Sequence, residues 1–213
     1  MAKHIERRLE KIGARQCHIL SHSFTGVDAR AAISMFGAQK HVQSLTTICS
    51  PHQGMRLIDI ASRNDGLAEL HNLDRVFEAL GITGRAALEF STHNMRAFNE
   101  VCENSDDVDY YSIGAKKGGR VMSKILKDGH DILVRDTFGK QCDGIIQDSE
   151  AHWGEYLLTF ENDHLEVMGF QPGHDPANVM NVVADNVRLC ELRNDEALSY
   201  EYGVDHLLKT KAI

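Results

Sequence analysis

Short apolar runs alternate with helix-like segments along this chain, and that alternation limits its fold more than any other feature. Four runs have the length and composition of strands: Cys17–Leu20, Val42–Cys49, Val108–Ile113 and Gly154–Leu158. Segments with helical spacing of apolar residues lie around them: Ile5–Ile12, Val27–Phe36, Leu67–Leu80, Ser91–Val101 and Pro176–Arg193. Strands that alternate with helices are typical of a parallel sheet. The sequence therefore predicts an α/β fold, with a mostly parallel sheet flanked by helices.

The chain has the length and composition of one globular domain. It has 213 residues, of which 42% are apolar and 25% are charged, and these values are ordinary for a folded domain with a sizeable core. It contains three prolines, and no linker, repeat or low-complexity tract interrupts it. We therefore expect a single domain over residues 1–213.

Charge and cysteine usage exclude several classes of partner. The net charge is −8 and no dense block of Lys or Arg occurs, so nucleic acid is not an expected partner. No apolar run approaches the roughly 18 residues that cross a bilayer, and residues 1–8 lack the apolar stretch of a secretory signal. The five cysteines form no CxxC pair, which fits a reducing compartment. We expect an intracellular, cytoplasmic location.

A serine stands at the junction of the first predicted strand and the next helix. Ser23 lies within Leu20–Gly26, at the position that a nucleophilic serine takes in the strained turn known as a nucleophile elbow. The usual pattern is G-x-S-x-G, because the residues two before and two after the serine must be small. Ser21 and Thr25 occupy those two positions here. Serine is small enough, whereas the β-branched threonine predicts a tight fit.

A nucleophilic serine needs a base and an acid that orients the base, and the second half of the chain offers both. Asp143 precedes a glycine in a predicted loop, and His164 follows in a polar loop 21 residues later (164 − 143). Neutral His164 would take the proton of the Ser23 hydroxyl. Asp143 would hold the imidazole in the correct tautomer and stabilise its cation. The order serine, acid, histidine is that of α/β hydrolases.

Each of these residues also has an ordinary structural interpretation. Ser23 could cap the following helix, and Asp143 before Gly144 could be a turn residue. His164 could be a surface loop histidine. His52, after a proline, is interpreted as a structural residue that holds a loop near the site.

The twelve histidines do not form a recognisable metal-binding motif. No HExxH and no clustered His/Cys spacing occurs. His130, Asp131 and Asp136 are close in sequence, and we interpret their segment as a loop. The sequence thus predicts no catalytic metal and no organic cofactor.

Five ordered blocks of the chain carry a resemblance to a known family. They are Leu20–Gly26 with Asp28-Ala29-Arg30, Ser50–Gly54, Phe90–Thr92 with Ala97–Asn99 and Tyr110–Ser112, Cys142–Ile146 with Trp153-Gly154, and Asp163–Glu166. Over about residues 5–170 the chain resembles the bacterial-type triacylglycerol lipases of the α/β-hydrolase fold, those related to the Pseudomonas and Burkholderia enzymes. The resemblance implies a lipid or small ester as substrate.

The same resemblance implies roles for individual residues. Ser23, Asp143 and His164 would be the catalytic triad of a serine carboxylic ester hydrolase, with an acyl-enzyme formed on Ser23. The Phe24 N–H would be one oxyanion donor. A helical cap or lid would lie at about residues 55–135, with the predicted helix Leu67–Leu80 as its lid; plain core packing is the alternative interpretation of that helix.

Three departures from the family pattern qualify these expectations. The elbow lacks both glycines. The family's structural calcium site uses an aspartate two residues after the catalytic histidine, and Glu166 is the calcium candidate at that place. Family members also begin with earlier strands and a His-Gly loop that supplies the second oxyanion N–H, so the resemblance implies an N-terminally truncated fold. The alternative function is therefore a catalytically weak or inactive homologue that acts as a binding or interaction module.

Overall fold

The computed structural model describes residues 1–63, 77–78, 81–119, 122–138 and 141–194. The chain divides into two compact units, Met1–Pro176 and Ala177–Ile213. The second unit contributes one described helix, α8 (Ala177–Asn194), which matches the predicted C-terminal helix. The first unit contains the sheet and every residue of the predicted site.

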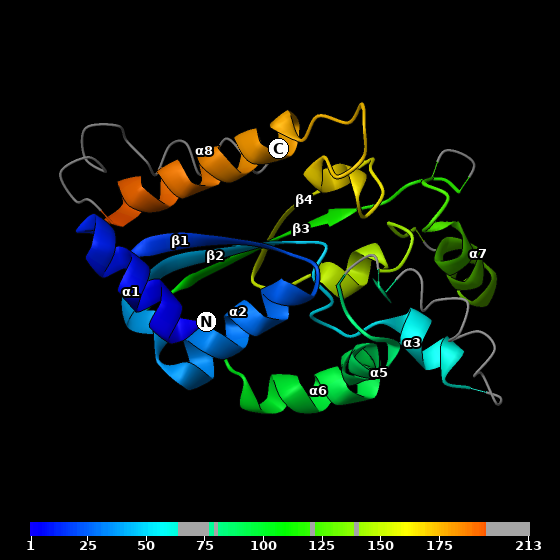
Figure 1. The fold of residues 1–213 in the computed structure, drawn as a ribbon, viewed down its shortest axis with the longest axis horizontal. Coiled ribbons are helices and arrows are strands. Elements are labelled where there is room, and N and C mark those ends of the chain that lie inside the picture. The colour runs from blue at the N-terminus through cyan, green and yellow to red at the C-terminus, as the bar shows by residue number, and fades with distance from the viewer. Residues whose placement is uncertain (64–76, 79–80, 120–121, 139–140, 195–213) are drawn as a thin grey trace. The chain divides into compact units, whose positions relative to one another are not determined.

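The first unit is built on a parallel sheet whose four strands lie side by side in chain order (Figure 1). Each strand was predicted within a few residues. They are β1 (Cys17–His22), β2 (Val42–Ile48), β3 (Asp109–Ala115) and β4 (Glu155–Phe160). All three neighbouring pairs are parallel, so the carboxyl ends of the strands share one edge of the sheet. The predicted α/β class with helices around a parallel sheet is confirmed.

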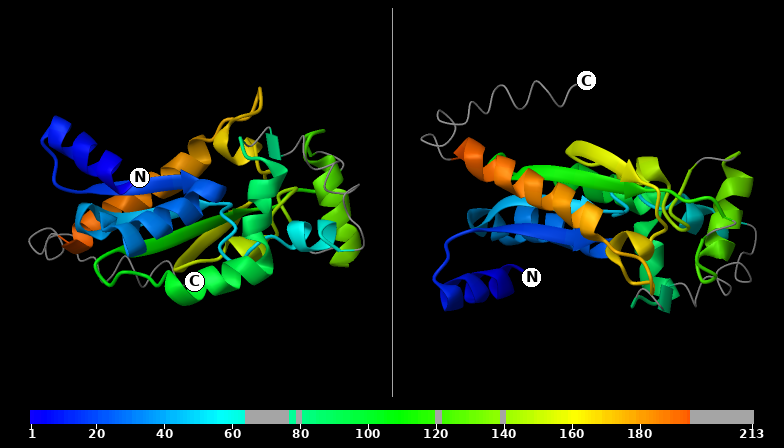
Figure 2. Two further views of the ribbon diagram at one scale, coloured as in Figure 1. Left: turned by 60° about the horizontal axis from the view of Figure 1, so that its bottom comes forward. Right: turned by 90° about the horizontal axis from the view of Figure 1, so that it is seen from above.

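Helices connect and flank these strands. The longer ones in this unit are α1 (Ala2–Ile12), α2 (Phe24–Phe36), α3 (Arg56–Ala61), α6 (Thr92–Val101) and α7 (Lys127–Asp136). Shorter helical turns are α5 (Gly84–Ala87), η1 (Ala38–His41), η2 (Leu88–Phe90), η3 (Asp148–Ala151) and η4 (Glu166–Met168). Helix α2 packs on β1 and β2, whereas α3 and α7 gather beyond the carboxyl ends of the strands (Figures 1 and 2).

Two buried apolar clusters hold the unit together. One lies between α2 and the sheet and includes Ala29, Ile33, Val42 and Leu45. The other collects side chains from the turn at Phe24, from α3 and α7, and from the loop after α7. Because the second cluster surrounds the carboxyl ends of the strands, it fixes the loops that carry the predicted site.

Helix α7 corrects one expectation from the sequence. The segment with His130, Asp131 and Asp136 is a helix and not a loop. Its only buried residues are Gly129 and Leu133, so its apolar pattern is faint. Gly129 is needed because a Cβ there would lie 2.5 Å from the Gly144 carbonyl oxygen. A glycine inside a helix lowers the helical signal of the sequence, and tertiary packing decides the outcome.

The predicted cap falls partly outside the described residues. Of the expected range 55–135, residues 64–76, 79–80 and 120–121 are not described, and the predicted lid helix Leu67–Leu80 lies mostly among them. The described part holds α3, α5, α6 and much of α7, but also the sheet strand β3. The cap therefore stays a prediction. Among the helices that the structure describes, none is long and apolar enough to cross a membrane.

Candidate active site

Ser23 occupies a strained turn between β1 and α2. Its φ is 59° and its ψ is −139°, a conformation that costs a non-glycine residue free energy and that collects at functional sites. The Ser23 N–H donates to the Ile48 carbonyl oxygen at the end of β2 (2.9 Å), which ties the turn to the sheet. Ser23 precedes the helix, but its side chain makes no capping hydrogen bond. The interpretation of Ser23 as a simple helix cap is therefore wrong.

The tight fit expected at Thr25 does not occur. Thr25 is exposed, and its hydroxyl donates to the His22 carbonyl oxygen (2.7 Å). The position that requires a small residue is Gly26, three residues after Ser23. A Cβ at Gly26 would clash with the Ser50 side chain and lie 3.0 Å from Thr47 Cγ2. Because α2 packs closely on β2, the glycine that this turn requires stands at position 26, one residue later than in the usual pattern.

Three side chains from distant parts of the chain form one line of hydrogen bonds. Ser23 Oγ lies 2.9 Å from His164 Nε2, and His164 Nδ1 lies 2.6 Å from Asp143 Oδ2. His164 is fully buried, Asp143 is 1% exposed and Ser23 is 7% exposed. The interpretation of His164 as a surface histidine is therefore wrong. This geometry lets neutral His164 accept the Ser23 proton while Asp143 orients the ring.

Backbone amides hold the Asp143 carboxylate in place. Its Oδ1 accepts from the Ile145 and Ile146 N–H groups (3.0 and 2.8 Å), which leaves Oδ2 for His164. The His164 N–H donates to the Asp143 carbonyl oxygen (2.9 Å), so the two loops are also joined through their backbones. The turn at Asp143-Gly144 is real, and it serves to aim the carboxylate.

Asp163 is a supporting residue that the sequence did not single out. Its side chain is fully buried, and Oδ1 accepts from the Leu165 and Glu166 N–H groups at 3.0 Å. Oδ2 accepts from the Ser123 N–H (2.9 Å). These bonds fix the loop that carries His164. The signal in the sequence was its place in the family block Asp163–Glu166, which assigned no role to the aspartate.

His22 is a second supporting residue, and its ring lies against the ring of His164. The two ring centroids are 4.5 Å apart, and the Phe170 ring also packs edge-on against His22, with a centroid distance of 5.9 Å. Burial, together with the charge that His164 can carry, lowers the pKa of His22 to about 2. His22 is therefore neutral at ordinary pH and adds no charge beside the candidate base.

His52 holds the loop after β2, as the sequence suggested. It is fully buried, with Nε2 2.9 Å from Thr47 Oγ1 and Nδ1 3.4 Å from the Arg30 guanidinium. Burial and the nearby Arg30 charge hold the pKa of His52 well below its usual value. Arg30 itself lies over the Trp153 ring at 3.3 Å. These contacts are structural, and none of these partners of His52 belongs to the Ser23–His164–Asp143 line.

The oxyanion candidate Phe24 is the first residue of α2. The first N–H groups of a helix have no acceptor within the helix, so the Phe24 N–H is free of an intrahelical bond. The Phe24 ring packs 4.5 Å from the ring of Phe90, which anchors the start of the helix. An oxygen bound to Ser23 would meet this N–H at the positive end of α2.

Glu166 does not offer a calcium site in this structure. Its Oε1 makes an ion pair with Lys117 Nζ and lies 3.0 Å from His174 Nε2, and its Oε2 accepts from the Asp163 N–H (3.0 Å). Both oxygens of this buried carboxylate are thus already used. Calcium needs six to eight oxygen ligands, whereas a lysine ammonium supplies the positive charge here. The residues present therefore do not fit the calcium site that the resemblance implied.

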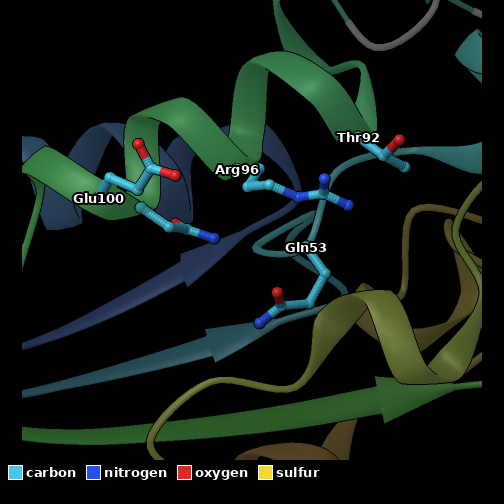
Figure 3. Close-up of a pocket in the computed structure, with 5 residues that line it drawn as sticks. Gln53, Thr92, Arg96 and Glu100 are labelled. Atoms are coloured by element: carbon cyan, nitrogen blue, oxygen red, sulfur yellow. The ribbon is translucent and has the colours of Figure 1, made fainter.

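A surface pocket of about 340 Å³ lies between α6 and the loop after β2 (Figure 3). It is lined by Gln53, Thr92, Arg96, Asn99 and Glu100. These side chains are polar, and none of them belongs to the Ser23–His164–Asp143 line. The pocket is therefore not where an acyl chain would meet Ser23.

The fold and the site together define the class of protein that this chain resembles. The parallel sheet, the strained serine turn and the order of the three side chains are those of the α/β hydrolases. No protein-family model matches the chain. Solved structures with the same fold include the mature Bacillus licheniformis lipase BlEst2 (TM-score 0.62, 22% identity, 76% of this chain and 64% of that chain). The Staphylococcus hyicus lipase is a second (TM-score 0.55, 14% identity, 85% and 71%). These likenesses show the α/β-hydrolase fold.

One curated protein matches at the level of sequence. Over 176 residues the chain is 27% identical to triacylglycerol lipase 2 of Saccharomyces cerevisiae, a match that covers 80% of this chain and 51% of that protein. The chain thus spans about half the length of this relative. It is similar to lipases and esterases, and a particular kinship with the Pseudomonas and Burkholderia enzymes stays a prediction.

Proposed function

We propose that this chain is a lipase-like serine hydrolase of carboxylic esters and that Ser23 is its nucleophile. The observation that carries the proposal is the hydrogen-bonded line from Ser23 Oγ through His164 to Asp143. It stands on a strained turn at the carboxyl edge of a parallel sheet, where catalytic residues of such folds collect. The similarity to a triacylglycerol lipase and to bacterial lipases supports an acyl ester as the substrate.

In the proposed reaction, Ser23 Oγ attacks the ester carbonyl carbon while His164 Nε2 takes the hydroxyl proton. His164 then gives that proton to the leaving alcohol, and an acyl-enzyme remains on Ser23. Water, activated by the same imidazole, releases the acid. Asp143 holds the proton of Nδ1 and stabilises the imidazolium in each half of the reaction. The Phe24 N–H donates to the oxyanion.

Turnover of a short-chain nitrophenyl ester tests the proposal. Ser23→Ala should lower kcat/KM by about 10⁴-fold or more, because the nucleophile is lost. Ser21→Ala is the matched control, since it removes the same hydroxyl two residues earlier and keeps a small side chain at that position of the turn. Equal rates for wild type and Ser23→Ala would exclude Ser23 from the mechanism. A folded chain without turnover would favour the binding-module alternative.

A further inference from the structure

A buried thiol lies beside the proposed acid and base, and the proposed mechanism does not use it. Cys49 Sγ, a carboxylate oxygen of Asp143 and a ring nitrogen of His164 all lie within 4.8 Å of one another. Each of the three side chains is at most 1% exposed. Within the described part of the chain, this is the group of His, Cys, Asp and Glu side chains that comes close enough to share a metal ion.

The backbone at Cys49 is strained. Cys49 directly follows β2 and has a φ of 48°, in the left-handed region that a residue with a Cβ enters only with strain. Its N–H donates to the Ile113 carbonyl oxygen (2.9 Å), so the strained residue is tied to β3. The side chain therefore points to Asp143 from a fixed position and is not a mobile surface thiol.

We propose that Cys49, Asp143 and His164 form a binding site for a thiophilic divalent cation, Zn²⁺ or Cd²⁺, and that such a cation inhibits the protein. One sulfur, one nitrogen and one oxygen are the donors that these ions favour, whereas Mg²⁺ and Ca²⁺ take oxygen ligands. The existence of the site stands on the geometry alone. Its inhibitory effect rests on the proposed function.

The dimensions of the group suit a small tetrahedral ion. Bonds of about 2.3 Å to sulfur and about 2.0–2.2 Å to nitrogen and oxygen hold ligand atoms about 3.3–3.7 Å apart. The present separations, at most 4.8 Å, need shifts of about 1 Å to reach that geometry. Burial and the carboxylates of Asp143, Asp148 and Asp163 raise the pKa of the Cys49 thiol well above its usual value, so the ion, which the same carboxylates attract, must displace the thiol proton. A water molecule would take the fourth ligand position.

A cation bound at this site would disable His164 as a base by changing the tautomer of its imidazole. Nδ1 is the ring nitrogen that faces Asp143, and Nε2 is the one that faces Ser23. A cation on Nδ1 requires that this nitrogen carry no proton, so the imidazole proton must reside on Nε2. The thiol proton is released to solvent as the sulfur binds. Nε2 is then a donor toward Ser23 Oγ and cannot accept its proton.

Cadmium titration of the metal-free chain tests the site without reference to activity. One equivalent of Cd²⁺ should bind per chain and give an ultraviolet sulfur-to-metal charge-transfer band. Both the binding and the band should depend on Cys49. Cys49→Ser should lose that band and at least about tenfold in affinity, the smallest effect that loss of a supporting residue has at metal sites. Cys17→Ser is the matched control, since Cys17 is the most exposed of the described free thiols and should leave the band in place. If Cys49→Ser fails to fold, Cys49→Gly replaces it, because glycine suits the φ of 48°.

The same variants separate the inhibitory effect from the site itself. Ester hydrolysis by wild type and Cys17→Ser should fall on addition of Cd²⁺ and return with EDTA, whereas the residual activity of Cys49→Ser should be insensitive to Cd²⁺. A band that survives in both Cys49→Ser and Cys49→Gly would overturn the site. A Cys49-dependent band in a chain without esterase activity would leave the site standing and contradict the proposed function. Equal inhibition of wild type and Cys49→Ser would overturn the inhibitory role.

Discussion

At the scale of single residues, the candidate base His164 lies against a second histidine ring, that of His22, which stays neutral. His164 is the candidate base, while His22 and His52 have pKa values lowered by burial and by nearby positive charge. His22 and His52 therefore stay neutral in the folded chain at ordinary pH and take up protons on unfolding. The free energy of unfolding should therefore depend on pH and fall in acid.

Acid should destabilise the fold through His22. Its pKa is about 2 in the folded chain and near 6.5 when unfolded, so between these values the unfolded chain binds the extra proton. The free energy of unfolding should therefore fall as pH decreases from 6.5, by up to about 1.4 kcal/mol per pH unit for this one proton. The stability that neutral His22 contributes is fully present above pH 6.5.

Replacement of His22 should remove that part of the slope. His22→Phe keeps a ring against His164 but cannot take up a proton, so denaturant unfolding between pH 4 and 6.5 should show a shallower fall in stability. His93→Phe is the control, because His93 is exposed on α6. An unchanged slope in His22→Phe would show that His22 already carries its proton in the folded chain.

At the scale of elements, the elbow works through the contact between α2 and β2. Pattern matching predicted a small residue at position 25, two after the serine. The structure places the close contact at Gly26, where the helix meets Thr47 and Ser50. The G-x-S-x-G motif describes where small residues usually stand around the serine. In this chain, the packing of α2 on β2 decides which position must lack a side chain.

Gly26→Ala should destabilise the fold by about 1–3 kcal/mol, the usual effect of an added methyl group in a filled core. The Cβ would lie 2.8 Å from Ser50 Cβ, so α2 must shift, and Ser23 with it. We expect a lower urea midpoint and reduced labelling of Ser23. Gly118→Ala is the control, since a Cβ there meets nothing within 4 Å. A Gly26→Ala protein as stable as wild type would mean that α2 has room to spare.

The helices and strands nearest the site were largely predictable, for identifiable reasons. Strand β2 reads as a continuous run because all but one of its residues are buried, and α6 begins where Ser91 caps it by accepting from the Asn94 N–H (3.3 Å). The order of Ser23, Asp143 and His164 along the chain indicated which side chains to place together. In contrast, Cys49 meets Asp143 and His164 only through tertiary contacts, and no local pattern marks such a residue.

At the scale of the whole molecule, a lysine stands where the family pattern implied a calcium ion. Lys117 lies two residues after the end of β3 and pairs with Glu166, which lies two residues after His164. The ion pair therefore links the central sheet to the loop of the candidate base. The Glu166 carboxylate is 3% exposed, so its charge depends on this partner.

Thermal unfolding should accordingly be the same in EDTA and in millimolar CaCl₂. Lys117→Met should lower the free energy of unfolding by about 3–5 kcal/mol, because it leaves a buried carboxylate without its ammonium. Lys127→Met is the matched control, since Lys127 pairs with Asp131 on the exposed surface of α7 and should matter by less than about 1 kcal/mol. A lower unfolding temperature in EDTA would contradict the replacement of calcium by Lys117.

Reaction with a fluorophosphonate probe, followed by mass-spectrometric mapping of the adduct, tests the central claim most directly. The probe reacts with a serine only where a base has activated it and an oxyanion donor is at hand. We predict one adduct per chain, on Ser23, that is absent from Ser23→Ala and His164→Ala but present in Ser21→Ala. A folded, monodisperse chain that takes no label, or that is labelled equally in Ser23→Ala, would contradict the account.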